Sequence, residues 1–565
     1  MPNRLLALLS LAAGASCTEP RPAPTATAPA PIPPEAIAAL DTAGLAAPLR
    51  VLAGDSLEGR LPGSRGEART IAYLEARFRA LGLQPGSPDG SYLQAVPLVG
   101  ITVQGAPALT LTRGGTTRTL RWRDDYVAWT KHVAPSAELR ASDLVFVGYG
   151  IEAPEFGWDD FKGLDVAGKT LVMLVNDPPL ADTTQFGGRA MTYYGRWTYK
   201  YEQGMRHRAA GVLLVHETGP AGYPFTVVQG KTAEQFDLVT PDRNLARPAV
   251  EGWLSLEAAQ ALFTMGGQSF DELKARATTR EFRPVPLGVT ASVALRTSLR
   301  EVRSHNVLAR LEGSDPWRRD QFVVYTAHWD HFGIGKPVDG DSIYNGAVDN
   351  ATGVAGLLAL AAAFRAAPTP PARSVLFLAV TAEEQGLLGS AYYALRPAWP
   401  LAKTLAVINM DGLNVWGPTR DLTVIGLGAS ELDDYATEAA DEQGRTLRPD
   451  PEPEKGFYYR SDHFNFAKAG VPAFDPGEGT DFIGRPKGYG MERREAYTAR
   501  LYHAPQDEVD AAWDLRGAVQ DLRLFLAMGW RVANAARFPD WRPGNEFRAA
   551  REASLRAARD SAAPR

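Results

Sequence analysis

The sequence Thr326-Ala-His328-Trp-Asp330-His331-Phe-Gly333 overlaps a short apolar run, 322–326, that is rich in β-branched and aromatic residues. Two further runs of this kind, 375–380 and 405–409, lead into Thr381-Ala-Glu383-Glu384 and Asn409-Met-Asp411. Such runs are typical of buried parallel strands. Residues 352–365 are apolar at helix length and begin at a Thr that can cap a helix. The pattern predicts an α/β fold with a mostly parallel central sheet.

Each of the three predicted strands is followed by side chains that can do chemistry. His328 follows the first strand, Glu383 and Glu384 the second, and Asp411 the third. A further carboxylate, Asp349, stands just before the predicted helix. Ligands of open α/β sheets bind outside the carboxyl ends of the strands, so we expect these residues to form one site.

The residue types indicate a hydrolytic metal site. Imidazoles and carboxylates without a thiolate are the ligands of zinc or a related divalent ion. His503 is the best placed second imidazole. His328, Asp349, Glu384, Asp411 and His503 are more ligands than one metal needs, which predicts two metals about 3.5–4 Å apart with a shared carboxylate.

Glu383 is left over beside its neighbour Glu384. Adjacent side chains diverge in a turn at a strand end, so one glutamate can bind metal while the other faces the water as general base. Taken singly, each of these residues has an ordinary structural explanation. Together and in this order they predict a catalytic centre.

The series His-x-Asp, Asn-Gly-Ala-x-Asp-Asn, Glu-Glu, Asn-Met-Asp and Tyr-His resembles the co-catalytic di-zinc aminopeptidase and glutamate carboxypeptidase family. The resemblance covers about 300–535 strongly and 36–125 more loosely. It implies a zinc exopeptidase fold, a three-layer sandwich around a mostly parallel sheet. It also implies two zinc ions per chain and a peptide substrate.

Carried over residue by residue, the resemblance implies two private ligand pairs and one bridge. His328 and Asp411 would bind one zinc, and Glu384 and His503 the other. Asp349 would bridge the two ions.

The resemblance also implies roles around these ligands. Glu383 would be the base, and the Asp330 carboxylate would orient His328. The Asp349–Asn350 peptide bond is expected to be cis. His331 and His463 are expected to be structural or to form the pocket wall.

Residues 456–464 mix aromatic and charged side chains, and the family has a similar stretch close to its substrate. Tyr458, Tyr459, Arg460 and Asp462 are therefore predicted to contact substrate, with a tyrosine or Arg460 as oxyanion donor. Packing of the aromatic residues at the sheet edge is the alternative. Residues 477–500, rich in Gly and Arg, are expected to be a flexible loop.

The segment 126–298 interrupts the peptidase pattern between its first part, 36–125, and its main part, 299–537. Strands are expected at 144–149, 170–175 and 212–215, with a helix at 200–210. This order resembles an inserted protease-associated domain of mixed α/β structure. Such a domain would cover the site as a wall or lid.

The N-terminus has the features of an export signal. Residues 1–17 combine Arg4, a short apolar run and small residues before Cys17, which is the only cysteine in the sequence. We expect an exported protein that is periplasmic, on the cell surface or secreted, either lipidated at Cys17 or cleaved near Ala15. Residues 18–35 are a Pro- and Ala-rich tether.

The amino-acid composition is typical of a soluble globular protein. The 565 residues are 45% hydrophobic and 22% charged, with a net charge of −5. Nothing indicates a nucleic acid partner, and a membrane is expected only through the N-terminal lipid. The tail 538–565 is Arg- and Ala-rich and is expected to be a solvated helix or a fraying end.

The predicted function is that of a zinc-dependent exopeptidase, with an aminopeptidase favoured by the family resemblance. A glutamate-type carboxypeptidase or dipeptidase is the alternative, because Arg460 or Arg485 could hold a C-terminal carboxylate. A non-catalytic receptor of the same architecture is disfavoured by the complete set of ligands and base.

Overall fold

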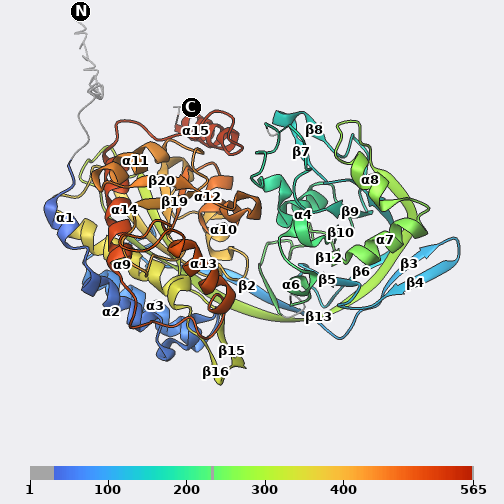
Figure 1. The fold of residues 1–565 in the computed structure, drawn as a ribbon, viewed down its shortest axis with the longest axis horizontal. Coiled ribbons are helices and arrows are strands. Elements are labelled where there is room, and N and C mark those ends of the chain that lie inside the picture. Colours follow the sequence, from blue (N-terminus) through green and yellow to red (C-terminus); the bar gives the residue numbers. More distant parts are fainter. Residues whose placement is uncertain (1–30, 183, 231–233, 563–565) are drawn as a thin grey trace, which may run out of the picture.

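The computed structural model describes residues 31–182, 184–230 and 234–562, arranged as two lobes (Figure 1). The predicted signal and Cys17 lie outside the described residues. Two long strands, β2 (Leu93–Val103) and β13 (Val285–Leu311), run from one lobe towards the other. They pair antiparallel from Leu93 opposite Val307 to Val103 opposite Thr297. The lobes are thus joined by a continuous hydrogen-bonded ribbon.

The first lobe contains the predicted α/β sheet. Its strands lie in the order β2, β13, β17, β14, β18, β21, β19, β20. The middle pairs, from β17 to β21, are parallel. The bounds are β14 Phe322–His328, β17 Ser374–Val380, β18 Thr404–Asn409, β19 Asp421–Ile425, β20 Thr446–Pro449 and β21 Ala473–Gly477.

Helices α9 (Gly353–Ala366) and α14 (Arg516–Asn534) cover one face of this sheet. Side chains of β14 alternate between faces, and Tyr325 points to this one. Its ring lies 5.6 Å from that of Phe364 on α9, and its hydroxyl donates a 2.7 Å hydrogen bond to the carbonyl oxygen of Phe525 on α14. The N-terminal helices α1 (Pro34–Ala38), α2 (Thr42–Leu52) and α3 (Arg65–Ala80) pack outside α9.

Helices α10 (Leu388–Leu395) and α12 (His463–Lys468) cover the other face. Tyr393 of α10 packs on Phe466 of α12 with ring centroids 5.6 Å apart, and both belong to the same core cluster as Val324 of β14. The first lobe therefore has the predicted three layers of helix, sheet and helix.

Helix α9 and the turn before it are the core of the lobe. Together they form the segment Ala347–Ala366, which is apolar and long enough to cross a membrane, but its most apolar 18-residue window is 94% buried inside the protein. This segment is a core helix, in agreement with the helix predicted at 352–365.

The second lobe holds four parallel strands: β6 (Ser136–Phe146), β9 (Thr170–Leu174), β10 (Gly211–Val215) and β12 (Val250–Leu254). Helix α4 (Trp197–Arg206) leads into β10, as predicted. The hairpin of β3 (Leu109–Arg113) and β4 (Thr116–Leu120) pairs with β13 in this lobe, although it precedes residue 126. The identity of this lobe as a protease-associated domain stays a prediction.

Two segments near the C-terminus are more ordered than the sequence suggests. The expected loop at 477–500 contains helix α13 (Tyr489–Arg500). The tail forms helix α15 (Arg548–Ala562), and Arg551 fastens it to the body. Arg551 is 1% exposed and donates to the carbonyl oxygens of Thr404 (2.8 Å) and Leu401 (3.2 Å). The tail is therefore a helix against the body, one of the two expected alternatives.

Candidate metal centre

The strand ends bring the predicted ligands together in the first lobe. His328 is the last residue of β14, Glu383 and Glu384 follow β17, and Asp411 follows β18. Asp349 lies in the turn before α9, and its peptide bond to Asn350 is cis, as the resemblance implied.

Asp349 is the centre of the cluster. Its Oδ1 lies 3.2 Å from His328 Nε2, and its Oδ2 lies 3.2 Å from His503 Nε2. Asp411 Oδ1 lies 3.1 Å from the same His328 nitrogen, and Glu384 Oε2 lies 3.2 Å from the same His503 nitrogen. The five residues form two ligand groups that share Asp349, which is the arrangement predicted for a bridging carboxylate.

These residues fit zinc. The donor set contains imidazole nitrogens and carboxylate oxygens only. His503 Nε2 is buried and makes no hydrogen bond within the described chain, although two carboxylate oxygens lie near it. Cations between these groups would offset the repulsion among the carboxylates and engage the nitrogen lone pairs.

The turn that carries Asp349 is fixed by Asp507. Its carboxylate accepts hydrogen bonds from the backbone N–H groups of Val348 (3.1 Å) and Asp349 (3.1 Å). Burial raises the pKa of Asp507 to about 6. Sequence reasoning missed this residue, although it lies only four positions after His503.

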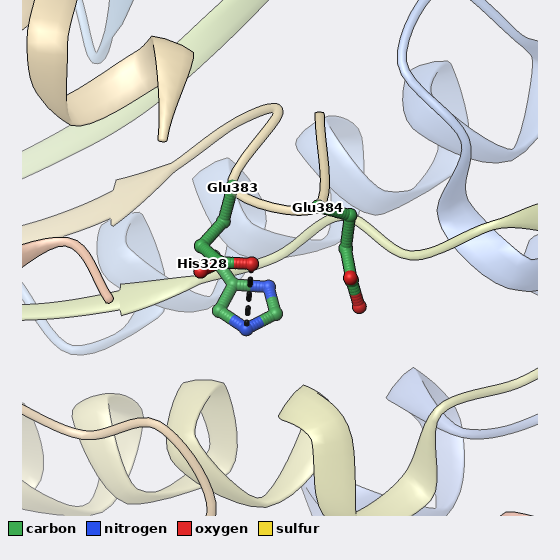
Figure 2. Close-up of side chains that lie close together, drawn as sticks. All are labelled: His328, Glu383 and Glu384. Carbon is green, nitrogen blue, oxygen red and sulfur yellow. Dashed lines mark ion pairs between the residues drawn. The ribbon is translucent and has the colours of Figure 1, made fainter. Parts of the chain in front are cut away.

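Glu383 and Glu384 diverge as predicted. Glu383 bends over the ring of His328, while the carboxyl group of Glu384 points away from it (Figure 2). Glu383 Oε2 lies 3.9 Å from His328 Nε2. Oxygens of Asp349 and Asp411 lie closer to this nitrogen, so Glu383 is near the predicted ligands without being one of them. Burial raises the pKa of Glu383 well above its ordinary value, against the attraction of His328. A carboxylate in this setting readily accepts a proton.

The predicted role of Asp330 needs correction. The Nδ1 atom of His328 lies 3.2 Å from the backbone oxygen of Asp330 and 3.8 Å from its carboxylate. The carboxylate instead accepts a 3.0 Å hydrogen bond from the N–H of Glu383. The main chain of Asp330 thus orients His328, because its carboxylate turns toward the Glu383 loop.

His331 supports the second ligand group. Its Nδ1 lies 2.5 Å from Glu384 Oε1, while the other oxygen of Glu384 faces His503. His331, Asp349 and Glu384 also lie close enough together to hold an ion. The contact with Glu384 fits the expected place of His331 in the pocket wall.

The sequence of the first lobe matches a known family at this site. Residues 306–527, which contain all five predicted ligands, match the model of peptidase family M28. This segment is similar to peptidase family M28, and residues 306–527 are therefore named the M28 domain.

A known protein matches a shorter part of the chain. A probable zinc metalloprotease of Pyricularia oryzae is 39% identical over 108 residues, which are 19% of this chain and 20% of that protein. The match therefore spans about a fifth of this curated relative.

Solved structures align over most of the chain at low identity. An aminopeptidase from Aneurinibacillus sp. strain AM-1 is 17% identical, with a TM-score of 0.48, over 90% of this chain and 96% of its own. BSAP, a zinc aminopeptidase from Bacillus subtilis, is 18% identical, with a TM-score of 0.41, over 92% and 98%.

Three of the four predicted substrate contacts of the M28 domain make contacts inside the protein. Tyr458 stacks on Phe547, and the hydroxyl of Tyr459 donates a 2.9 Å hydrogen bond to Glu546. Asp462 is 0% exposed and accepts a 2.5 Å hydrogen bond from Ser390. The 3-10 turn Phe457–Tyr459 and helix α12 set the direction of these side chains, and their contact with substrate stays a prediction.

His463 is structural, as expected. It is 0% exposed, the ring of Tyr458 packs edge-on against it at 4.7 Å, and burial lowers its pKa to about 3. The imidazole is therefore neutral. Arg460 is the one predicted substrate contact that remains exposed among the described residues.

Two further residues lie close to the cluster. Tyr502 stacks on the ring of His503 with centroids 3.7 Å apart and is 48% exposed. Tyr502 was not predicted as a site residue, although its position next to His503 in the sequence could have indicated it. Arg60 lies beneath the site and donates hydrogen bonds to the carbonyl oxygens of Asn345 (2.6 Å) and Gly346 (3.1 Å). No local pattern marks it, because its partners lie far away in the sequence.

Proposed function

We propose that this chain is a zinc-dependent exopeptidase that releases N-terminal residues from peptides, with two metal ions bridged by Asp349. The observation that carries the proposal is the Asp349 carboxylate, whose oxygens each lie 3.2 Å from a different imidazole, His328 or His503. The M28 domain supports peptide hydrolysis. The resemblance to a zinc metalloprotease supports zinc as the metal.

Glu383 is the general base of this proposal. Bound at these ligands, two zinc ions would activate a water molecule and polarise the scissile carbonyl group. Glu383 takes the proton of the attacking water and passes it to the leaving amine. Its raised pKa suits it to hold that proton between the two steps. The hydrogen bond from its N–H group to Asp330 keeps its loop in place.

Tyr502 is the proposed donor to the carbonyl oxygen of the substrate. Its side chain is 48% exposed and its ring stacks on that of His503, so this tyrosine lies next to the cluster and can be reached from solvent. A donor held in this way stabilises the charge that develops on that oxygen during attack. This role replaces the one predicted for Tyr458 and Tyr459, which are packed elsewhere.

The charge of the site favours an aminopeptidase. The side chain of Asp411 is 27% exposed at the cluster, and Glu383 lies beside it. Carboxylates at the site attract the free α-amine of a peptide. A glutamate-type carboxypeptidase or dipeptidase remains the second candidate because Arg460 is exposed and could hold a C-terminal carboxylate. A receptor without activity is disfavoured, since both ligand groups and the base are present.

Hydrolysis of leucyl p-nitroanilide by the full chain tests the proposal. We expect hydrolysis that stops with a strong chelator and returns with added zinc. The N-acetylated compound, which lacks the free amine, should resist cleavage. Equal cleavage of both compounds would contradict an aminopeptidase. Preferential cleavage of N-blocked dipeptides with a free C-terminus would support the carboxypeptidase alternative.

A further inference from the structure

Glu383 and Glu384 lie on one loop whose two ends are hydrogen-bonded to each other (Figure 2). The loop follows β17 and runs from Thr381 to Gly389, the second residue of α10. The N–H of Gly389 donates a 2.9 Å hydrogen bond to the carbonyl oxygen of Thr381. The shape of this closed loop therefore determines where both carboxyl groups point.

The backbone of the loop is in an unfavourable conformation on each side of the two glutamates. Ala382 has a φ of 53° and Leu387 has a φ of 61°. Left-handed backbone is uncommon for residues other than glycine, and it persists where the surrounding structure holds it in place. The loop thus depends on contacts that keep its two ends together.

Asn306 supplies such contacts from outside the loop. Its side chain is 0% exposed, and its Oδ1 accepts a 3.0 Å hydrogen bond from the N–H of Thr381. Its Nδ2 donates a 2.9 Å hydrogen bond to the carbonyl oxygen of Gly389. A Cβ atom added at Gly389 would lie 2.6 Å from Asn306 Oδ1, so the approach is close. One buried amide group therefore bonds both ends of the loop at once.

Asn306 lies where β13 leaves the sheet of the first lobe. The pairing of β13 with β17 ends at Val307 opposite Ala379, and Asn306 is the next residue of β13 toward the second lobe. Its second amide hydrogen is donated to Gln94 Oε1 on β2, at 2.9 Å. The loop of the two glutamates is thus attached to the ribbon that joins the lobes.

Ser304 adds a weaker attachment from the same ribbon. Its hydroxyl group donates a 2.9 Å hydrogen bond to Glu67 on α3 and accepts one of 2.5 Å from the hydroxyl of Thr381. This contact reaches one end of the loop, whereas Asn306 bonds both ends. Asn306 is therefore the residue on which the closed shape depends most.

We propose that Asn306 is a positioning residue that holds Glu383 and Glu384 in place through the backbone of their loop. The N–H of Glu383 bonds the Asp330 carboxylate at 3.0 Å, and Glu384 Oε2 lies 3.2 Å from His503 Nε2. A shift of the loop would move the proposed base and a proposed metal ligand together. The expected effect on rate rests on the proposed peptidase function.

Asn306→Leu tests this role, because leucine has nearly the same size and makes no hydrogen bonds. With leucyl p-nitroanilide and the full chain at saturating zinc, kcat should fall by about 10–100-fold, since displacement of catalytic groups by about 1 Å can cost that much. KM should change little. Zinc should bind about tenfold more weakly, as is usual when a residue that supports a ligand is lost.

Asn306→Asp keeps the shape of the side chain and the acceptor for Thr381. Burial favours the protonated form of this carboxyl group, which can donate to the carbonyl oxygen of Gly389. The rate of Asn306→Asp relative to wild type should therefore rise as the pH is lowered from about 8 to about 6. A ratio of rates that does not change with pH would contradict the need for a donor to Gly389.

Gln94→Met is the matched control. It removes the bond of Asn306 within the ribbon and leaves both bonds to the loop, so kcat, KM and zinc affinity should stay at their wild-type values. An Asn306→Leu protein that is less stable but has wild-type kcat and zinc affinity would overturn the inference. So would a Gln94→Met protein that loses as much activity as Asn306→Leu.

Amide hydrogen exchange separates this inference from the proposed function, because it needs no turnover. In the full chain at saturating zinc, the amide of Gly389 should exchange at least about tenfold faster in Asn306→Leu than in wild type, since the loop opens more easily. The amides of β17 should not change. Faster exchange confined to the loop would support the inference even if no peptide were hydrolysed. Equal exchange in both proteins would overturn it even if leucyl p-nitroanilide were a good substrate.

Discussion

Arg60 Nε donates a 2.7 Å hydrogen bond to the carbonyl oxygen of Trp329, the residue next to ligand His328. Arg60 is 1% exposed, and its other donors reach the carbonyl oxygens of Leu52 (2.5 Å) and Asn345 (2.6 Å). One buried side chain thus ties the N-terminal segment to the loops that carry two metal ligands. Burial lowers the pKa of Arg60 to about 10, so it remains charged at neutral pH.

Replacing Arg60 should destabilise the M28 domain. In Arg60→Met, several buried carbonyl oxygens lose their donors, each at a cost of about 1–3 kcal/mol. We expect the free energy of unfolding in urea to fall by at least about 3 kcal/mol on this basis. Arg60→Lys, which keeps the charge and some donors, should lose less. An Arg60→Met protein as stable as wild type would show that these hydrogen bonds do not stabilise the domain.

Glu383→Gln should abolish turnover and leave the metals bound. The amide has nearly the same shape but cannot accept a proton, and loss of a general base costs about 10²–10⁴ in rate. Glu257→Gln, an exposed change on α7 (Leu256–Met265), is the control and should be fully active. Rates on leucyl p-nitroanilide with zinc content measured alongside give the answer. A metal-loaded Glu383→Gln protein with wild-type rate would remove Glu383 from this role.

Loss of ligands should change the zinc count in a defined pattern. His328→Ala and His503→Ala should each lose one ion, because each belongs to one ligand group. Asp349→Ala should weaken both, since it serves the two groups. Elemental analysis of the purified variants measures this, with His207→Ala in the second lobe as control. Two tightly bound zinc ions in Asp349→Ala would contradict the proposal that Asp349 bridges them.

Glu546 should make stability depend on pH away from the metal centre. Burial raises its pKa to about 7, and Tyr459 donates a hydrogen bond to it. A carboxyl group whose folded pKa is raised stabilises the fold below its unfolded pKa, near 4.5, and this contribution is lost as the pH rises through about 7. The free energy of unfolding of the wild-type protein should fall between pH 5 and pH 7. In Glu546→Gln, which cannot lose this proton, that fall should be smaller by on the order of 2 kcal/mol. Urea unfolding at pH 5 and pH 7 measures this. An equal change in the free energy of unfolding in both proteins would refute the prediction.

Anchoring through Cys17 is a prediction from the sequence alone, since this residue lies outside the described part of the chain. Two or three acyl chains give stable anchoring, at about 0.8 kcal/mol per buried CH₂ group. Expressed with its N-terminal segment in a bacterial host, the wild-type protein should fractionate with membranes, and Cys17→Ser should be soluble. A wild-type mature mass without lipid would rule out this anchor.

The sequence predicted the sheet and the residues that meet at its edge because both depend on local pattern. The strands ending at His328, Val380 and Asn409 were recognisable from apolar runs, and chain topology then placed their ends together. Glu383 could be assigned because it adjoins Glu384 in a turn.

The remaining parts of the site depend on long-range packing and could not be predicted. Tyr459 and Asp462 turn inward because a 3-10 turn and a short helix set their direction. Arg60 reaches the site from a distant segment, and no local pattern marks it. Two oxygens of Asp330 lie near His328 Nδ1, and the backbone oxygen, at 3.2 Å, is closer than the predicted carboxylate, at 3.8 Å.

The central claim is that two zinc ions bridged by Asp349 carry the peptidase reaction. Titration of the metal-free protein with zinc, followed by hydrolysis of leucyl p-nitroanilide, tests it most directly. The account predicts that activity rises until about two ions are bound per chain and then stays constant. Full activity at one ion per chain, or no activity at any zinc level, would contradict it.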